Sequence, residues 1–309
     1  MDRRRFLGVA GAVAGIGAGV GLGAAGGLLG GDPVPVRLGA GRPGGMFHDF
    51  ALLLAEVAAS ADTLRIEPVA TDGSRANLKL LGDGKIDAAL TLADAAAISD
   101  VPIRAIGRLY ESYIQLAVRA DSPVRTTADL RGHRVDLGVV GSGAAMTAER
   151  LLRAADLNPE LDTVVSHRPL AAAIQTLLSG GVDAIIWGDG LPTPELDAPR
   201  RTRLIDTGCL APALQRQFQF RYDSMTIPAD AYPAHPTVST IGVPNLLVGT
   251  PAMAHRTAAA LTDLLLRRSA DLMPDQALGF QFLTRRWLIV TGTLPLHPGA
   301  ADSYREFHG

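Results

Sequence analysis

The sequence is poor in the residues that hold metals and disulfide bonds. A single cysteine, Cys209, stands among its 309 residues, which excludes an intrachain disulfide and any zinc site with two cysteine ligands. The seven histidines are never closer than 11 residues to one another, so the sequence also lacks the helical H-E-x-x-H zinc motif. We therefore expect no metal site.

An excess of one charge is lacking too. The chain carries 29 lysines and arginines against 31 aspartates and glutamates, a formal net charge of −2. Proteins that bind nucleic acid usually show a basic surplus or a basic stripe, so nucleic acid is not an expected partner. With 47% hydrophobic and 19% charged residues the composition is globular, and the length is that of roughly two domains.

What the sequence has in plenty is glycine, concentrated at the N-terminus. Eleven of its 34 glycines lie in residues 1–31, which carry three arginines at positions 3–5 and then no charge from Phe6 to Gly31. A basic start before an apolar stretch is typical of an export signal, and paired arginines before Phe-Leu resemble a twin-arginine signal. About 20 apolar residues also suffice to cross a bilayer, so an uncleaved membrane anchor is the alternative. Both interpretations predict an extracytoplasmic protein, in the periplasm or on the outer face of the cytoplasmic membrane.

The remaining chain alternates short apolar runs with helical patterns, which predicts an α/β fold. Strands are expected at 34–38, 64–69, 86–92, 114–118, 134–139, 182–187 and 237–248, and helices at 46–60, from the turn at 71–74 to 81, 94–98, 144–155, 170–178 and 253–269. Similar strand, turn and helix units recur after residue 128, which indicates two related lobes. Residues 32–120 with 237–309 would form the first lobe and residues 121–236 the second, because the proline-rich stretch 228–244 would carry the chain back.

Three of the expected turns place glycine or serine where a helix begins. They are the turns at 39–45, 71–74 and 141–144. A serine that caps a helix satisfies one backbone N–H, and the remaining N–H groups and the helix dipole favour a bound anion. Ordinary capping would explain any one of these turns, but three of them in two lobes indicate a site for a carboxylate or a phosphate. Arg42 and Arg75 would add charge-assisted hydrogen bonds to such an anion.

The turn at 39–44 also fits the G-x-G-x-x-G pattern of dinucleotide-binding folds, and Glu67 stands where a ribose-binding acid would. Pro43, however, has no backbone N–H and removes one donor from the turn that would hold the pyrophosphate. An NAD(P)-dependent oxidoreductase is therefore an alternative, and we expect neither a cofactor nor an enzyme. Nucleophilic catalysis finds no support, because Val140 replaces the first glycine of the G-x-S-x-G motif around Ser142.

Four further side chains are candidate contacts of a ligand. Asp94 and Asp189 each sit at a strand end, where an acid can contact a ligand or lie in solvent. Tyr110 and Trp187 would stack on the apolar part of a ligand if they lie at the cleft, although aromatic residues more often belong to the core.

Seven short motifs occur in order over nearly all of residues 34–306. They are the glycine turn at 39–45, Thr71-x-Gly73-Ser74-x-x-Asn77-Leu78 leading to Gly84-x-x-Asp87-Ala88, Asp129-Leu130-x-Gly132, Gly141-Ser142-Gly143 followed by Thr147-Ala148-Glu149-Arg150, Gly190-x-Pro192-Thr193-Pro194, Thr226-Ile227-Pro228-Ala229-x-x-Tyr232-Pro233, and Pro295-Leu296-His297-Pro298-Gly299-Ala300 with Tyr304 and Glu306. In these motifs the chain resembles the TAXI-type solute-binding proteins of TRAP (tripartite ATP-independent periplasmic) transporters. It departs from them where Arg42 and Pro43 replace small residues and where Phe47 replaces an expected tyrosine.

The resemblance implies a two-lobed periplasmic-binding-protein fold, each lobe a mixed, mostly parallel sheet flanked by helices, with a hinge that closes on a solute. It implies a small carboxylate as the solute, such as glutamate or a 2-oxoacid, and an integral-membrane, cation-coupled TRAP permease as the partner. By matching position, the pocket would be lined by Gly45, Thr71, Ser74, Asn77, Ser142 and Gly143. The residues around these turns and the strand-end candidates complete the expected contacts: Gly44, Met46, Phe47, Gly73, Asp94, Tyr110, Ala144, Trp187, Asp189 and Gly190. A ligand-binding subunit of a membrane sensor has the same fold, and the sequence does not choose between transport and sensing.

Overall fold

The computed structural model describes residues 34–62, 64–193, 196, 201–229, 231–232, 235–273 and 283–309. The expected export signal or anchor at 1–31 lies outside these residues, as do Pro194 and Pro233 of two motifs. The unit that begins at Pro33 and ends at Gly309 contains every element described below. None of the described helices is long and apolar enough to cross a membrane.

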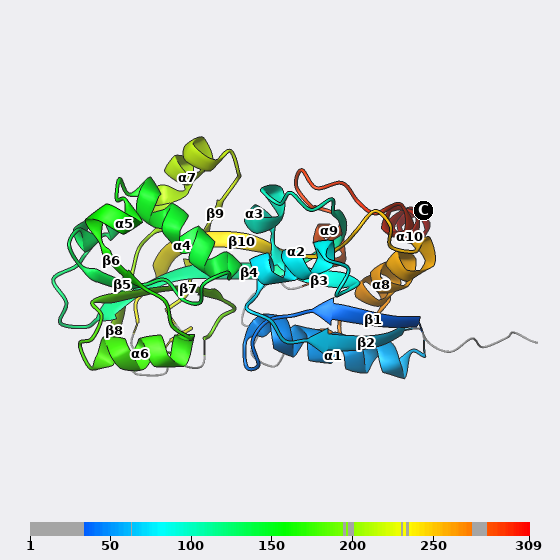
Figure 1. The fold of residues 1–309 in the computed structure, drawn as a ribbon, viewed down its shortest axis with the longest axis horizontal. Helices are drawn as coiled ribbons and strands as arrows, with labels where there is room; N and C mark the ends of the chain where they lie inside the picture. The colour runs from blue at the N-terminus through cyan, green and yellow to red at the C-terminus, as the bar shows by residue number, and fades with distance from the viewer. Residues whose placement is uncertain are drawn as a thin grey trace, which may run out of the picture. The chain divides into compact units, whose positions relative to one another are not determined.

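One sheet runs through this unit, in the order β2-β1-β3-β10-β4-β7-β5-β6, while β8 pairs with β4 and β9 with β10 (Figure 1). The strands are β1 (Val34–Gly39), β2 (Leu64–Val69), β3 (Ala88–Leu92), β4 (Arg104–Arg119), β5 (Arg134–Asp136), β6 (Val164–Ser166), β7 (Ala184–Asp189), β8 (Thr202–Ile205), β9 (Asp223–Ile227) and β10 (Val238–Gly249). β1 is parallel to β2 and β3, and β5 is parallel to β6 and β7. Between these two parallel groups, β10 and β4 are antiparallel to their neighbours.

Helices follow most of the strands. They are α1 (Met46–Ser60), α2 (Ser74–Gly82), α3 (Ala93–Ala97), α4 (Gly143–Ala154), α5 (Pro159–Asp162), α6 (Leu170–Leu178), α7 (Ala211–Phe218), α8 (His255–Arg267), α9 (Arg285–Leu288) and α10 (Pro298–His308), with 3₁₀ turns η1 (Thr127–Leu130) and η3 (Gly208–Leu210). We call residues 34–97, which hold β1–β3 and α1–α3, the β1 half. Residues 134–189, which hold β5–β7 and α4–α6, are the β5 half.

Helices cover both faces of the sheet in each half. In β7, Ile185 packs in the same apolar cluster as the buried face of α6, whereas its neighbour Ile186 packs in the cluster of α4. Since side chains alternate across a strand, α4 and α6 lie on opposite faces, as Figure 1 shows. In β3, Leu90 packs with α1 and Ala89 with α2, so these two helices are likewise separated by the sheet.

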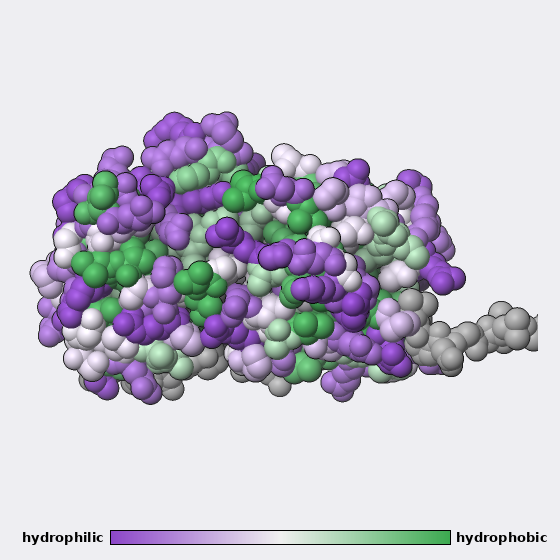
Figure 2. Space-filling view, in the orientation of Figure 1, coloured by the Kyte–Doolittle hydropathy of each residue, from purple (hydrophilic) through white to green (hydrophobic). Residues whose placement is uncertain are grey.

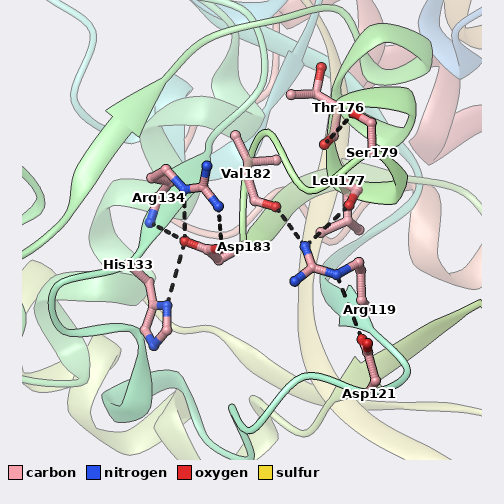
Figure 3. A network of polar contacts seen from close by, with 9 residues as sticks. All are labelled: Arg119, Asp121, His133, Arg134, Thr176, Leu177, Ser179, Val182 and Asp183. Carbon is pink, nitrogen blue, oxygen red and sulfur yellow. Dashed lines mark hydrogen bonds and ion pairs between the residues drawn. The ribbon is translucent and has the colours of Figure 1, made fainter.

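An arginine–aspartate pair ties the parallel strands together in each half. Arg37 of β1 donates a hydrogen bond of 2.8 Å to Asp87, which precedes β3, and Arg134 of β5 donates one of 2.7 Å to Asp183, which precedes β7. In both pairs the backbone N–H of the arginine also donates to the carboxylate. Figure 3 shows the second pair together with Arg119, which donates to carbonyl groups at the end of α6 and before β7. The two halves therefore use the same brace, an arginine in one strand paired with the aspartate that precedes its neighbouring parallel strand.

The two long strands that lie between the halves share an irregular point. Pro244 of β10 pairs with Glu111, but Leu246 pairs with Arg108, so two residues of β4 stand opposite one of β10. The amide of Asn245 fills this bulge and donates to the carbonyl of Tyr110 and to Oγ of Ser112, both at 3.0 Å.

The expected α/β fold is confirmed, with differences in some elements. The helices at 46–60 and 170–178 and the strand at 64–69 have the expected bounds. The expected strand at 114–118 is only the last part of β4, and β5 ends three residues before the expected boundary at 139. The short strands β6 and β8, together with α7, β9 and α10, were not expected from the sequence.

Candidate functional site

A cavity of about 300 Å³ opens at the carboxyl ends of the parallel strands. Its wall is built by the loops that follow β1, β2, β5 and β6 and by the end of β7, so both halves contribute. In α/β sheets the carboxyl ends of the strands are where ligands usually bind, because the loops and helix starts converge there. The position of this cavity makes it the candidate site.

Four helices begin in the wall of the cavity. α1 begins at Met46, α2 at Ser74, α4 at Gly143 and α6 at Leu170, and all four residues line the cavity. The first N–H groups of a helix have no partner inside the helix, and they form the positive end of its dipole. The cavity therefore has the donors and the partial positive charge that suit an anion.

The starts of α2 and α4 touch each other. A Cβ atom on Gly143 would lie 2.5 Å from Oγ of Ser74, so only a glycine allows this approach. Gly73, the residue before α2, has a φ of 106°, a conformation that favours glycine, and a Cβ on it would lie 3.7 Å from Cα of Ser142. Ser142 caps α4, since its Oγ accepts a hydrogen bond of 3.0 Å from the N–H of Ala145.

The hydroxyl of Ser74 is buried in the wall, where its side chain is only 1% exposed. Its oxygen accepts a hydrogen bond of 2.9 Å from the N–H of Leu92. A hydroxyl can also donate one hydrogen bond, and no acceptor for it is found among the residues that the structure describes. An unused buried donor is costly, so an acceptor that enters the cavity would gain from binding here.

Charged groups line the cavity from both halves. Nη2 of Arg42 donates to the Asp72 carboxylate at 2.8 Å, and both side chains are about half exposed. Nη1 of Arg168 donates to Asp136 at 2.6 Å, and Asp136 is fully buried. Asp189, at the end of β7, adds a third carboxylate to the wall.

The remaining wall is mostly apolar. Trp187 lies in it, and its Nε1–H donates to Oγ1 of Thr193 at 3.1 Å, which fixes the position of the indole. The other apolar lining residues are Pro43, Met46, Phe47, Leu92, Leu137, Val139, Ala144, Pro169, Leu170, Ala171, Ala173, Ile185 and Ile186. A mostly apolar wall with a few placed polar groups is typical of a small-molecule site.

Most of the sequence-predicted contacts meet in this cavity. The predicted residues that line it are Gly44, Gly45, Met46, Phe47, Gly73, Ser74, Ser142, Gly143, Ala144, Trp187 and Asp189. Five predicted residues do not line it, namely Thr71, Asn77, Asp94, Tyr110 and Gly190.

Thr71 and Asn77 lie behind the wall and shape its turns. The Asn77 amide is buried and donates to the carbonyl groups of Gly39, Ala40 and Leu90. Oγ1 of Thr71 donates to Oδ1 of Asn77 at 2.6 Å. Their polar groups are thus used inside the protein to hold the loops after β1 and β2.

Asp94 is fully buried in an internal cluster. Its Oδ2 accepts hydrogen bonds from the hydroxyls of Thr147 at 2.8 Å and Tyr222 at 2.9 Å, and Nη1 of Arg150 lies 3.6 Å away. Burial raises the pKa of Asp94, although the Arg150 charge and the two hydroxyls act in the opposite direction. This carboxylate therefore faces partners from α4 and the segment before β9, and not the cavity.

Tyr110 and Gly190 have packing roles. The Tyr110 ring is buried against Phe50 of α1, with 5.6 Å between the ring centres. Gly190 follows β7, and a Cβ on it would lie 2.3 Å from Cε of Met46, so this glycine makes room for a residue of the wall.

The glycines of the G-x-G-x-x-G pattern pack tightly as well. A Cβ on Gly39 would lie 2.4 Å from Ile86, and one on Gly41 would lie 2.9 Å from Phe47. Both positions require glycine for close packing of the turn, whether or not a nucleotide binds.

Several lining residues were not predicted from the sequence. They are Gly41, Pro43, Asp72, Leu92, Ser112, Asp136, Leu137, Gly138, Val139, Arg168, Pro169, Leu170, Ala171, Ala173, Ile185, Ile186 and Gly188. One signal could have found Arg168: like the three turns, it lies close to the start of a predicted helix, two residues before Leu170. The surface around these elements is a mosaic of hydrophilic and hydrophobic residues on the face shown in Figure 2.

Known proteins resemble the chain in family and in fold. A model of the NMT1-like family matches residues 38–307. The periplasmic sulfonate-binding protein SsuA from Methylobacillus flagellatus KT is 14% identical, with 90% of this chain and 96% of that chain covered and a TM-score of 0.54. The periplasmic aliphatic sulphonate binding protein SsuA from Escherichia coli is 18% identical, with 88% and 79% covered and a TM-score of 0.45. The match with a TM-score of 0.54 shows that the mixed α/β fold is that of the periplasmic binding proteins.

Proposed function

We propose that this chain, which belongs to the NMT1-like family, is an extracytoplasmic solute-binding protein that captures a small carboxylate-type anion. The observation that carries the proposal is the buried Ser74 hydroxyl, which has no acceptor for its proton among the described residues and lines one cavity together with the starts of four helices. Free N–H groups, helix dipoles and a free hydroxyl donor can bind a carboxylate although none of these groups carries a full positive charge.

The lining favours binding over a reaction. Among the described residues of the wall there is no histidine, lysine, cysteine or tyrosine to act as a base or nucleophile. The Ser142 hydroxyl is used as a helix cap, and the Ser74 hydroxyl has a backbone N–H as its donor. These contacts support a preorganised set of donors, and we propose no catalytic step.

We propose that the chain closes around its solute as two lobes, residues 32–120 with 237–309 and residues 121–236. The β1 half belongs to the first lobe and the β5 half to the second, and β4 and β10 run between them. A cavity walled by both halves supports this division, because closing two lobes on a solute buries it between them.

The partner that we propose is an integral-membrane TRAP-type permease. The support is the resemblance of seven ordered motifs to the TAXI-type proteins, two of which, at 71–78 and 141–150, supply the starts of α2 and α4. The basic and apolar leader at 1–31 supports a location outside the cytoplasm. Delivery to this transporter, like the carboxylate itself, is part of the proposal.

Calorimetric titration of the full-length protein with acetate, pyruvate, glutamate and 2-oxoglutarate tests the binding function. We expect at least one of these anions to bind with a defined stoichiometry. Ser74→Ala removes a donor to a charged group, so it should weaken binding by about tenfold or more.

The matched control is Ser179→Ala. Ser179 is exposed at the end of α6, outside the cavity, where its hydroxyl donates to the carbonyl of Thr176 (Figure 3). This variant should bind like the wild type. The proposal is wrong if no carboxylate binds, or if Ser74→Ala and Ser179→Ala have equal affinities for the anion that does bind.

A further inference from the structure

Arg168 places a positively charged guanidinium in the wall, and hydrogen bonds to neighbouring residues hold this side chain in position. The residue lies between β6 and α6 and lines the cavity. Nη1 of its guanidinium donates to Oδ2 of Asp136 at 2.6 Å and to Oγ of Ser166 at 2.5 Å. The two ends of this contact are 32 residues apart in the chain.

The Asp136 carboxylate holds Arg168 at both ends of its side chain. Asp136 is fully buried, and its Oδ1 accepts from the backbone N–H groups of Arg168 and Gly138. Its Oδ2 accepts from Ser166 and from the guanidinium. With four donors the carboxylate is satisfied, so its function is to fix the arginine and the loop that carries it.

One edge of the guanidinium is left for a ligand. Within the described part of the chain, Nε and Nη2 of Arg168 have no acceptor, although the side chain is 37% exposed and lines the cavity. Arg42 is different, since both its Nε and its Nη2 donate to Asp72, a carboxylate that is half exposed. A planar guanidinium with a free edge is suited to a carboxylate.

Arg168 and Ser74 reach the cavity from different sides. Arg168 lies two residues before the start of α6, whereas Ser74 touches the start of α4, and α4 and α6 cover opposite faces of the sheet. A single carboxylate bound at Ser74 and Gly143 would leave the free edge of Arg168 unpaired. A solute with acceptor groups at both of its ends would satisfy the two sites together.

We propose that Arg168 binds the solute directly, with Asp136 as its positioning residue, and that the solute is a small molecule with a second anionic group. This inference rests on the proposed function, because it assigns the first anionic group to Ser74 and the starts of α2 and α4. Arg168 then determines specificity: it selects dianions over monoanions of the same length. Asp189 is the competing group, since a carboxylate in the wall would favour a solute with a cationic end.

Chain-matched probes test the selectivity. The full-length protein is titrated with succinate against butyrate, glutarate against pentanoate, and adipate against hexanoate. We expect at least one dicarboxylate to bind about tenfold or more tightly than its matched monocarboxylate, the size of a charge-assisted hydrogen bond. In Arg168→Gln this preference should fall to about twofold or less.

Removal of Arg168 alone leaves the buried Asp136 without its cation, and the variant can fail to fold for that reason. The double variant Asp136→Asn/Arg168→Gln removes both charges and serves as the second test, with the same expected loss of preference. Arg153→Gln is the matched control, because Arg153 is an exposed arginine of the β5 half outside the cavity. It should keep the wild-type preference.

The outcomes separate this inference from the proposed function. Equal binding of mono- and dicarboxylates by the wild type, or a preference that survives in both Arg168 variants, overturns the role of Arg168 and leaves the carboxylate-binding function standing. If 4-aminobutyrate or 5-aminopentanoate binds more tightly than the matched dicarboxylate, the second group is cationic and the inference is wrong. Failure of every carboxylate to bind overturns the proposed function and this inference together.

Discussion

The Asp94 carboxylate accepts a hydrogen bond from the Thr147 hydroxyl at 2.8 Å, and this contact joins α3 of the β1 half to α4 of the β5 half. Two more residues of α4 approach the β1 half: Gly143 lies against Ser74, and Arg150 lies 3.6 Å from Asp94. Residues 143, 147 and 150 share one face of the helix. This face links the cavity, where α4 begins, to a buried charged cluster.

Asp94→Ala is expected to destabilise the protein strongly. It leaves Arg150 buried without its carboxylate and removes the acceptor of Thr147 and Tyr222. Breaking a buried charge pair in this way costs about 3–5 kcal/mol, which urea unfolding would measure. Asp94→Leu/Arg150→Met, which removes both charges, should lose less. Asp100→Ala, at an exposed aspartate, is the control and should change stability by about 0.5 kcal/mol or less. An equal effect of the Asp94 and Asp100 variants would contradict the cluster.

Gly143→Ala is expected to force the starts of α2 and α4 apart. The new Cβ would lie 2.5 Å from Oγ of Ser74 and 2.9 Å from Cδ1 of Leu92, which is too close for either contact. Overpacking of this kind costs about 1–3 kcal/mol of unfolding free energy. Ser74→Gly in the same chain removes the closest atom, so the double variant should recover part of the loss in a double-mutant cycle. If the effects of Gly143→Ala and Ser74→Gly on the unfolding free energy are additive, the close approach of residues 74 and 143 does not contribute to stability.

The free energy of unfolding should fall as the pH rises from about 4.5 to about 7, owing to Glu111. This carboxyl is buried in β4 near Arg108, Asp223 and Tyr113, and burial raises its pKa from 4.5 to about 7, against the effect of Arg108. The folded state then holds the proton more tightly than the unfolded state, and stability is lost as that proton leaves. The shift corresponds to about 3 kcal/mol.

Urea unfolding at a series of pH values measures this effect, and Glu111→Gln should flatten the curve over the same window. Glu56→Gln is the control, since Glu56 is an exposed glutamate of α1. If the free energy of unfolding falls with pH equally steeply in Glu111→Gln and Glu56→Gln, the group that loses its proton in this window is not Glu111.

Tryptophan emission should report solute binding. The chain has two tryptophans: Trp187 lines the cavity, and Trp287 is 55% exposed under the guanidinium of Arg108. A solute that enters the cavity changes the surroundings of the Trp187 indole and therefore its emission. Trp287→Phe should keep the response and Trp187→Phe should abolish it; the reverse result would place the solute elsewhere.

Local sequence signals predicted the elements and turns that depend on neighbouring residues. The helix at 46–60 repeats apolar residues at Phe50, Leu54 and Val57, and these are buried in one face. The turns before α2 and α4 were recognised from glycine and serine, and they hold five of the eleven predicted contacts that line the cavity, namely Gly73, Ser74, Ser142, Gly143 and Ala144. β4 was predicted at only a third of its length, because the part of this buried strand before residue 114 also holds polar residues such as Glu111 and Ser112.

Contacts between distant residues could not be predicted in this way. Asp94 stood at a strand end as a candidate ligand contact, but Tyr222, 128 residues away, donates to it inside the protein. Arg168 depends on Asp136, which was expected only as part of a strand. In both cases the chemistry follows from the arrangement of strands in the sheet, which a single sequence does not state.

The bulge opposite Asn245 has a mechanical consequence. Pro244 offers no N–H to the ladder between β10 and β4, and the pairing shifts directly after it. A bulge of this kind bends and twists the strand that carries it, here β4. Ser112, whose Oγ accepts a hydrogen bond from the Asn245 amide, also lines the cavity. The bulge in the strands that link the halves thus adjoins the cavity, so a change in the bend at this point would move a residue of the wall.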